Sequence, residues 1–141
     1  MTVRAILSGK GDAVTSISPD ATVMDAVTLL ANRRIGAVPV TDGDTVLGIL
    51  SERDVIYGLD RDGPAALEKR VGDVMTSPAL TVDPDSQAMS AIALMTKRRI
   101  RHLPVVEGTR MIGFISIGDL VKYRIDRIED EAAALRDYIA S

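Results

Sequence analysis

Two segments of the chain, residues 17–60 and 82–125, align with each other without a gap at an offset of 65 residues. About 14 of the 44 aligned positions are identical, and about ten of the others exchange one aliphatic residue for another. The identities include Pro19 with Pro84, Gly48 with Gly113 and Asp54 with Asp119. Gapless agreement at Pro, Gly and Asp indicates one supersecondary unit that occurs twice. The fold must therefore consist of two similar halves.

Each half predicts the order strand, helix, strand, strand, helix. Apolar residues at helical spacing predict a helix after each Pro-Asp pair. An Asp-Gly or Glu-Gly pair between two apolar runs predicts a hairpin. In the first half we expect an extended piece at 16–17, a helix around 23–30, strands at Ala37–Val40 and Val46–Leu50, and a helix at Glu52–Leu59. In the second half the counterparts are 81–82, 88–95, His102–Val106, Met111–Ile115 and Ile117–Ile125.

Capping residues are present before both of the first helices of the repeats. Asp20 or Thr22 can cap the first helix, and Asp85 or Ser86 its counterpart. Residues 60–70 are polar and predict a linker with one helical turn, and 126–140 predict an amphipathic tail helix. This divides the chain into a first repeat (1–60), a linker and lead-in (61–75), a second repeat (76–125) and a tail (126–141). Each short βαββα unit leaves one apolar sheet face open, so we expect the two to pack face to face around one shared core within a single α/β (α+β) module.

Composition excludes several classes of function. The net charge is −3 and there are four aromatic residues and no Trp, which argues against nucleic acid as the main partner. The chain has no Cys and one His, so disulfides, thiolate chemistry and Cys- or His-cluster metal sites are not expected. No stretch approaches the roughly 20 apolar residues of a membrane span, and the first residues do not resemble a signal peptide. We therefore expect a cytoplasmic protein with no membrane partner.

One string occurs in both repeats where a strand passes into a helix. It reads Gly-h-h-Ser-x-x-Asp, with h apolar, at Gly48–Asp54 and Gly113–Asp119. Backbone N–H groups at such a helix start favour an anion, Ser can donate to a phosphate oxygen, and Asp can accept from two vicinal hydroxyls. A phosphorylated ribose has these groups. Ser-x-x-Asp also matches a capping box that only satisfies the helix start, and the two roles are compatible.

The chain resembles a tandem pair of CBS (cystathionine-β-synthase) domains, often called a Bateman module. The resemblance covers about residues 3–123 and is carried by residues 34–40, residues 99–105, the two Gly-h-h-Ser-x-x-Asp strings and the lead-in 71–76. It implies pseudo-twofold symmetry and a non-catalytic stand-alone module that binds an adenine nucleotide in clefts between the repeats. AMP is the expected ligand, with NAD(H), ADP or ATP as alternatives and no catalytic cofactor.

The resemblance also implies roles for individual residues. Asp54 and Asp119 would hold ribose, and Ser51 and Ser116 would meet phosphate. Aliphatic and backbone groups would surround the base. The residues implied at this position are Ser16, Ile17, Ile35, Gly36, Ala37, Val38 and Pro39 in the first repeat, and Thr81, Val82, Ile100, Leu103 and Pro104 in the second.

The resemblance implies that each nucleotide reaches its phosphate across to the other repeat, and that the two sites differ. Arg101 and His102 would meet the phosphate of the nucleotide on Asp54, and Arg53 that of the nucleotide on Asp119. Their counterparts in the other repeat, Gly36, Ala37 and Gly118, carry no such groups. His102 can equally be a structural residue, and the cations at 33–34 and 97–99 suit helix C-termini without any ligand.

We therefore interpret the chain as a regulatory sensor of adenine nucleotides, with a role in energy sensing, that signals to an unidentified partner protein. The alternative is a ligand-independent adaptor or oligomerisation scaffold whose tail helix is the working surface. We do not expect an enzyme, because the sequence offers no nucleophile or metal-ligand cluster. We expect a homodimer, since two small repeats cannot cover all their apolar surface and Ala132, Leu135 and Ile139 form an apolar stripe on the tail.

Overall fold

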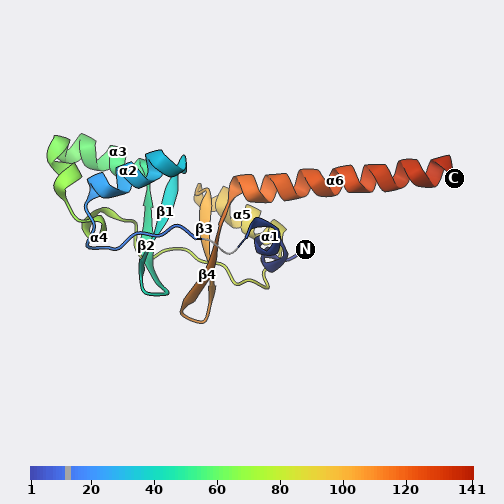
Figure 1. Cartoon of the computed structure of the whole chain (residues 1–141), viewed down its shortest axis with the longest axis horizontal. Helices are drawn as coiled ribbons and strands as arrows, with labels where there is room; N and C mark the ends of the chain where they lie inside the picture. Colours follow the sequence, from blue (N-terminus) through green and yellow to red (C-terminus); the bar gives the residue numbers. More distant parts are fainter. Residues whose placement is uncertain (12–13) are drawn as a thin grey trace.

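A computed structural model describes residues 1–11 and 14–141 of the chain. Its elements are α1 (Val3–Lys10), α2 (Val23–Arg33), β1 (Ala37–Asp42), β2 (Thr45–Ser51), α3 (Glu52–Asp62), the 3-10 helix η1 (Gly63–Glu68), α4 (Val71–Val74), α5 (Ala88–Arg98), β3 (His102–Glu107), β4 (Arg110–Ser116) and α6 (Ile117–Ala140). The four strands form one antiparallel sheet in the order β1-β2-β4-β3 (Figure 1). The predicted mixed fold of two repeats and a C-terminal helix is confirmed.

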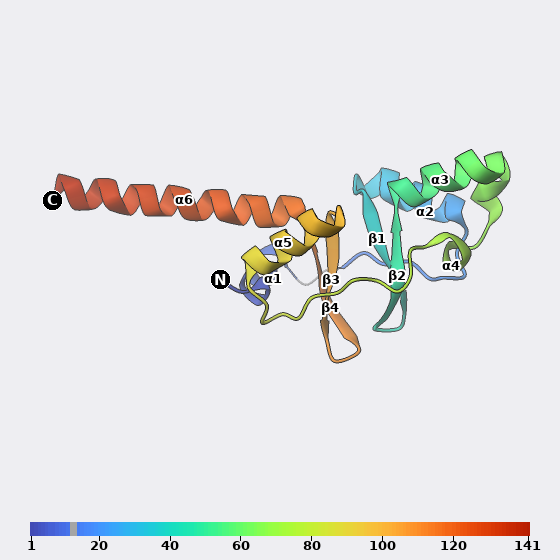
Figure 2. The same cartoon turned by 180° about the vertical axis from the view of Figure 1, so that it is seen from behind.

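The two hairpins are built alike. Ala37 lies opposite Ser51 in the first and His102 opposite Ser116 in the second, at the same offset of 65 that relates the sequences. Both ladders shift register at matching places, after Val40 and after Val105. The hairpins meet through one antiparallel bridge between β2 and β4 (Figure 2). The predicted pseudo-twofold relation is thus present in the backbone.

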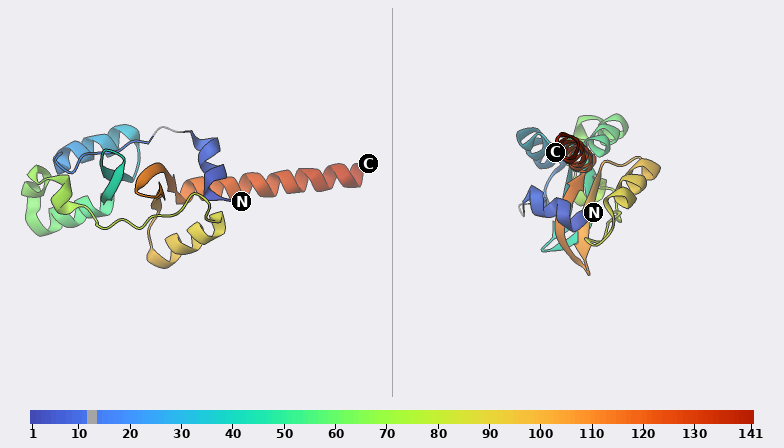
Figure 3. Two further views of the ribbon diagram at one scale, coloured as in Figure 1. Left: turned by 90° about the horizontal axis from the view of Figure 1, so that it is seen from below. Right: turned by 90° about the vertical axis from the view of Figure 1, so that its right-hand side faces the viewer.

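Each half has its own hydrophobic core, in place of the single shared core that we expected. The first cluster centres on α2, β1 and β2, and the second on α5, β3 and β4. The lead-in segments cross over: Val3 and Ile6 of α1 lie in the core of the second repeat, whereas Val71 of α4 lies in the core of the first. Each repeat therefore closes its core with the segment that precedes the other, which ties the halves together (Figure 3).

The helix starts agree with the sequence only in part. Thr22 caps α2 in a capping box with Asp25, as predicted for Thr22. Neither Asp85 nor Ser86 caps α5, which begins after Gln87 without a side-chain cap, so that prediction is wrong. The N-terminal segment takes the place of the cap, because the Met1 carbonyl accepts from the Ala88 N–H at 2.9 Å.

The two helices predicted at the C-terminus are one. Helix α6 runs without a break from Ile117 to Ala140 because no Gly or Pro follows Gly118 within it. Its second half extends away from the rest of the molecule (Figures 1 and 3).

The glycine that opens each Gly-h-h-Ser-x-x-Asp string lies under a lead-in segment. A Cβ on Gly48 would lie 2.5 Å from the Thr76 carbonyl oxygen, and one on Gly113 would lie 2.6 Å from a methyl of Leu7. The Thr76 backbone is fixed, since Ile49 and Thr76 exchange two backbone hydrogen bonds of 3.0 and 2.9 Å. The Leu7 side chain can rotate. The glycines are thus explained by close approach of the crossing segments.

We predict that Gly48→Ala destabilises the protein more than Gly113→Ala. The first substitution overpacks against backbone, which costs about 1–3 kcal/mol, and the second against a flexible side chain. Urea unfolding of both variants and the wild type measures the difference. Equal losses, or a larger loss for Gly113→Ala, would contradict this explanation.

Candidate functional site

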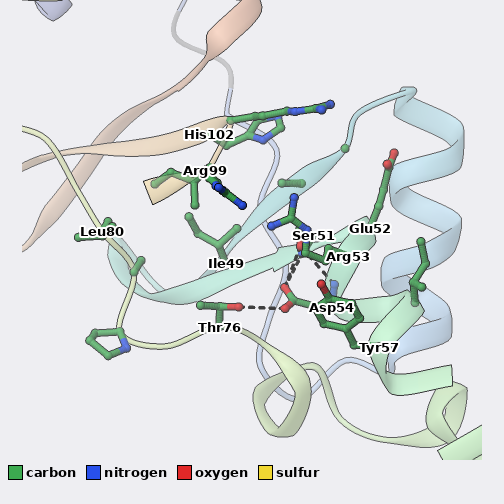
Figure 4. A pocket seen from close by; sticks show the side chains of 17 residues that line it. Ile49, Ser51, Glu52, Arg53, Asp54, Tyr57, Thr76, Leu80, Arg99 and His102 are labelled. Atoms are coloured by element: carbon green, nitrogen blue, oxygen red, sulfur yellow. Dashed lines mark hydrogen bonds between the residues drawn. The ribbon is translucent and has the colours of Figure 1, made fainter. Parts of the chain in front are cut away.

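A pocket of about 500 Å³ lies between the two repeats, within the usual size range for small-molecule sites. Its walls come from the ends of β1 and β2, the first turns of α3, the segment 76–80 and the residues that join α5 to β3 (Figure 4). The lining residues are Gly36, Ala37, Ile49, Ser51, Glu52, Arg53, Asp54, Ile56, Tyr57, Thr76, Pro78, Ala79, Leu80, Arg99, Ile100, Arg101 and His102. Ser51 and Asp54 of the first repeat therefore share one pocket with the basic residues of the second repeat.

Ser51 and Asp54 form a complete capping box at the start of α3. The Asp54 carboxylate accepts from the Ser51 N–H at 2.8 Å and the Ser51 hydroxyl at 3.1 Å, and Ser51 Oγ accepts from the Asp54 N–H at 3.3 Å. Thr76 donates its hydroxyl to the other carboxylate oxygen at 2.9 Å (Figure 4). A carboxylate offers about four lone-pair sites, so these three bonds leave Asp54 able to accept from a ligand. The capping role is present, and it leaves room for binding.

Positive groups of the second repeat face this carboxylate across the pocket. Arg99 and Arg101 line it together with His102, and Arg53 adds a third guanidinium from α3. We expected Arg53 to meet the phosphate of a nucleotide on Asp119; it lines the Asp54 pocket, and its role toward a ligand on Asp119 stays a prediction. It lies in the first turns of α3, the same helix as Asp54, so both side chains project from one helix start.

His102 lines the pocket together with Arg99 and Arg101. Its ring stacks on Phe114 with centroids 5.5 Å apart, and burial, followed by the charge of Lys10, lowers its pKa. Gly36 lies next to the imidazole, since a Cβ at this position would be in van der Waals contact with it at 3.7 Å. A neutral imidazole can donate one hydrogen bond and accept another.

The corresponding carboxylate of the second repeat has a different partner. Asp119 accepts from the Ser116 N–H at 2.8 Å, as Asp54 does from Ser51, but it also binds the Lys10 ammonium at 2.7 Å. Lys10 donates as well to the Phe114 carbonyl at 2.6 Å. Burial opposes ionisation of Asp119, yet the hydrogen bonds from Lys10 and Ser116 together outweigh it and lower its pKa. The two Ser-x-x-Asp strings therefore carry unequal sites, and Lys10 occupies the second.

We predict that Lys10→Met raises the pKa of Asp119 and makes the protein less stable at neutral pH. A carboxylate whose folded pKa lies below its unfolded value contributes stability that is present above the unfolded pKa and lost as pH falls through the folded pKa. The wild type should exceed Lys10→Met by about 1 kcal/mol or less at pH 7, and by less at pH 3. Urea unfolding at both pH values measures this. A difference independent of pH would mean that Lys10 acts only through the Phe114 carbonyl.

The pocket contains only part of the residues expected from the sequence. Gly36, Ala37, Ser51, Arg53, Asp54, Ile100, Arg101 and His102 line it, whereas Ser16, Ile17, Ile35, Val38, Pro39, Thr81, Val82, Leu103, Pro104, Ser116 and Asp119 do not. The side chains of Val38 and Leu103 are fully buried in the two cores, so only their backbone could face a ligand. Ile17 and Val82 form isolated parallel bridges with β1 and β3.

Several lining residues were not expected from the sequence: Ile49, Glu52, Ile56, Tyr57, Thr76, Pro78, Ala79, Leu80 and Arg99. Thr76 lies in the lead-in that carried the family resemblance, and this was a signal for it. Arg99 reads as a helix C-terminal cation, and it does end α5 in a left-handed conformation with φ 54°. Its guanidinium nonetheless lines the pocket.

No helix in residues 1–11 and 14–141 is both long enough and apolar enough to span a membrane. The same residues contain no group of three or more His, Asp or Glu side chains placed to hold a metal ion.

Two copies of one unit with a pocket of about 500 Å³ between them define a tandem-repeat module. A family model described as the CBS domain matches residues 11–61 and 71–126, and the chain therefore belongs to the CBS-domain family. The CBS domain-containing protein CBSX3, mitochondrial, of Arabidopsis thaliana is 33% identical over 147 residues, covering 98% of this chain and 71% of that protein.

Solved structures of the family have the same fold. The CBS-domain containing protein ATU1752 from Agrobacterium tumefaciens matches with a TM-score of 0.82 and 40% identity, over 87% of this chain and 92% of that one. The structure of CBSX2 in complex with AMP matches with a TM-score of 0.76 and 27% identity, over 89% of this chain and 96% of that one.

Proposed function

We propose that this protein is a non-catalytic regulatory module that binds an adenine nucleotide in the Asp54 pocket. The observation that carries the proposal is the meeting of Ser51 and Asp54 from one repeat with Arg101 and His102 from the other in one pocket. AMP is the ligand we favour, with ADP, ATP or NAD(H) as alternatives, and the AMP complex of the similar protein CBSX2 supports this choice.

In the proposed complex, Asp54 accepts from the ribose hydroxyls. The phosphate then reaches the basic residues of the second repeat, chiefly Arg101, because guanidinium groups bind phosphate oxygens in a planar, bidentate manner. Aliphatic residues such as Ile49 and Ile100 contact the base, which is consistent with the small number of aromatic residues. The ligand thus touches both repeats, and its binding energy can favour one relative placement of them over another.

The first test is a thermal melt with and without ligand. A ligand that binds only the folded protein adds about 2.7 kcal/mol of stability at 100 times its dissociation constant. We predict a clear rise in melting temperature with millimolar AMP, and mass spectrometry of small molecules that copurify should find an adenine nucleotide. A melting temperature unmoved by AMP, ADP, ATP and NAD(H) would favour the alternative of a ligand-independent adaptor.

The non-catalytic part of the proposal has its own test. The Ser51 hydroxyl donates to the Asp54 carboxylate, but we do not expect this pair to act as nucleophile and base, because the contact belongs to the capping box at the start of α3. Nucleotide incubated for a long time with the protein should be recovered intact. Hydrolysis above the rate of buffer alone would overturn this part.

We also propose that the protein acts as a homodimer that signals its ligand state to a partner protein. The apolar residues exposed on α6 support this, since contiguous exposed apolar surface commonly marks an interface.

A further inference from the structure

The second half of α6 buries no side chain against the rest of the described residues, although Arg127 and Glu131 border a hollow beside Met1 and Gln87. Every residue from Arg124 to Ala140 is exposed, and Leu120 is the one buried residue of the helix. At about 1.5 Å per residue, these 17 residues extend roughly 25 Å as a free helix (Figures 1 and 3). Most helices in proteins are stabilised by packing of an apolar face more than by helix propensity. This part of α6 has no such packing among the described residues.

The apolar residues of this helix follow a heptad spacing. Val121, Ile125, Ile128, Ala132, Leu135 and Ile139 are separated alternately by four and three residues. The five larger side chains are between 47% and 74% exposed, so none is covered by its own chain. Leu120, which packs into the second core, lies about 100° around the helix from Val121. The stripe thus lies on a different side of the helix from Leu120 and has the a/d pattern of a coiled coil.

Charged residues beside the stripe favour one direction of pairing. In a parallel pair, Arg124 of one copy lies next to Glu129 of the other, and Glu131 lies next to Arg136, so that both contacts are attractive.

An antiparallel pair with the same apolar overlap brings together like charges. It places Glu129 opposite Glu129, Glu131 opposite Glu131, and Lys122 opposite Arg136. All three contacts are repulsive, so the charge pattern selects against this arrangement.

We propose that α6 pairs with α6 of a second copy of this chain as a parallel two-stranded coiled coil. Because both helices then start at the same end, the two nucleotide-binding modules lie together at that end and the C-termini at the other. This pairing does not depend on the proposed nucleotide function.

The first experiment compares the oligomeric state of two matched variants by analytical ultracentrifugation of the full chain. Ile128→Glu/Leu135→Glu adds two carboxylates to the stripe, and Ala133→Glu/Ala134→Glu adds two carboxylates to the same turns outside it. We expect the wild type and the second variant to be dimers at micromolar concentration and the first to be a monomer. A monomeric wild type, or a dimeric stripe variant, overturns the proposal. Far-ultraviolet circular dichroism checks that both variants remain folded.

The second experiment tests the direction of the helices. The chain has no cysteine, so Ile139→Cys introduces a single thiol. A parallel pair places this thiol beside its copy, and mild oxidation should give a disulfide-linked dimer. An antiparallel pair places Ile139 opposite Val121, about 27 Å from its copy, which is far beyond disulfide reach. Absence of the Ile139→Cys cross-link, or cross-linking only in a mixture with Val121→Cys, overturns the parallel arrangement.

Discussion

Asp54→Ala is expected to abolish AMP binding, whereas Asp119→Ala is expected to leave it intact. In the proposed complex Asp54 accepts two hydrogen bonds from the ribose, each worth about 1.5 kcal/mol or more for a charged acceptor. Losing both weakens binding by about a hundredfold or more. Asp119 is outside the pocket and is bound to Lys10, so its removal takes nothing from this ligand. Calorimetric titration of AMP into both variants measures the difference.

Asp119→Ala is also the control for stability. Both carboxylates complete a capping box, so each substitution removes an equivalent helix cap, a loss of about 1 kcal/mol. Each substitution also removes one further contact, with the Thr76 hydroxyl for Asp54 and with the Lys10 ammonium for Asp119, so the two losses of unfolding free energy should differ by about 1 kcal/mol or less. If both variants bind AMP like the wild type, the Ser-x-x-Asp strings are helix caps and nothing more.

The local elements of the fold could be predicted because their causes are local. Apolar periodicity and the turn between the strands are enough to place β1, β2 and their counterparts, and the pairing of Asp42 with Thr45 follows from the hairpin. The register shift after Val40, which brings Ala37 opposite Ser51, does not follow from it. The continuous α6 was missed because the end of the second repeat was taken as the end of its helix. No helix-breaking residue occurs at that point.

The contacts that could not be predicted join segments far apart in the chain. Met1 caps α5 through a backbone carbonyl, and any residue type can supply such a group. Lys10 reaches Asp119 across 109 positions. The crossing of the lead-in segments has no pattern of its own, since Val3 and Val71 read as ordinary apolar residues. Their exchange between the two cores is decided by how the halves pack.

In the candidate site, too, the sequence predicted some of the residues and missed others. Repetition of Ser-x-x-Asp identified Ser51 and Asp54, and the family resemblance placed Arg101 and His102 beside them. The position of Arg53 in the wall of the Asp54 pocket depends on the geometry of the helix start, which the sequence does not specify. The inequality of the two sites was expected from the second repeat's Arg101 and His102, but the strongest difference comes from Lys10, which lies outside both aligned repeats.

Arg101→Ala is expected to weaken AMP binding by about tenfold or more and to leave adenosine binding nearly unchanged. A hydrogen bond between a guanidinium and a phosphate is worth about 1.5–3 kcal/mol, and only AMP carries the phosphate. Arg98→Ala is the matched control, because Arg98 is a cation three residues away that does not line the pocket. Titration of both ligands into both variants distinguishes a direct contact between Arg101 and the phosphate from attraction by the net charge of the region. An equal loss in the two variants would mean that the net charge of the region attracts the nucleotide. An equal loss for AMP and adenosine would place Arg101 against the base or ribose and overturn its assignment to the phosphate.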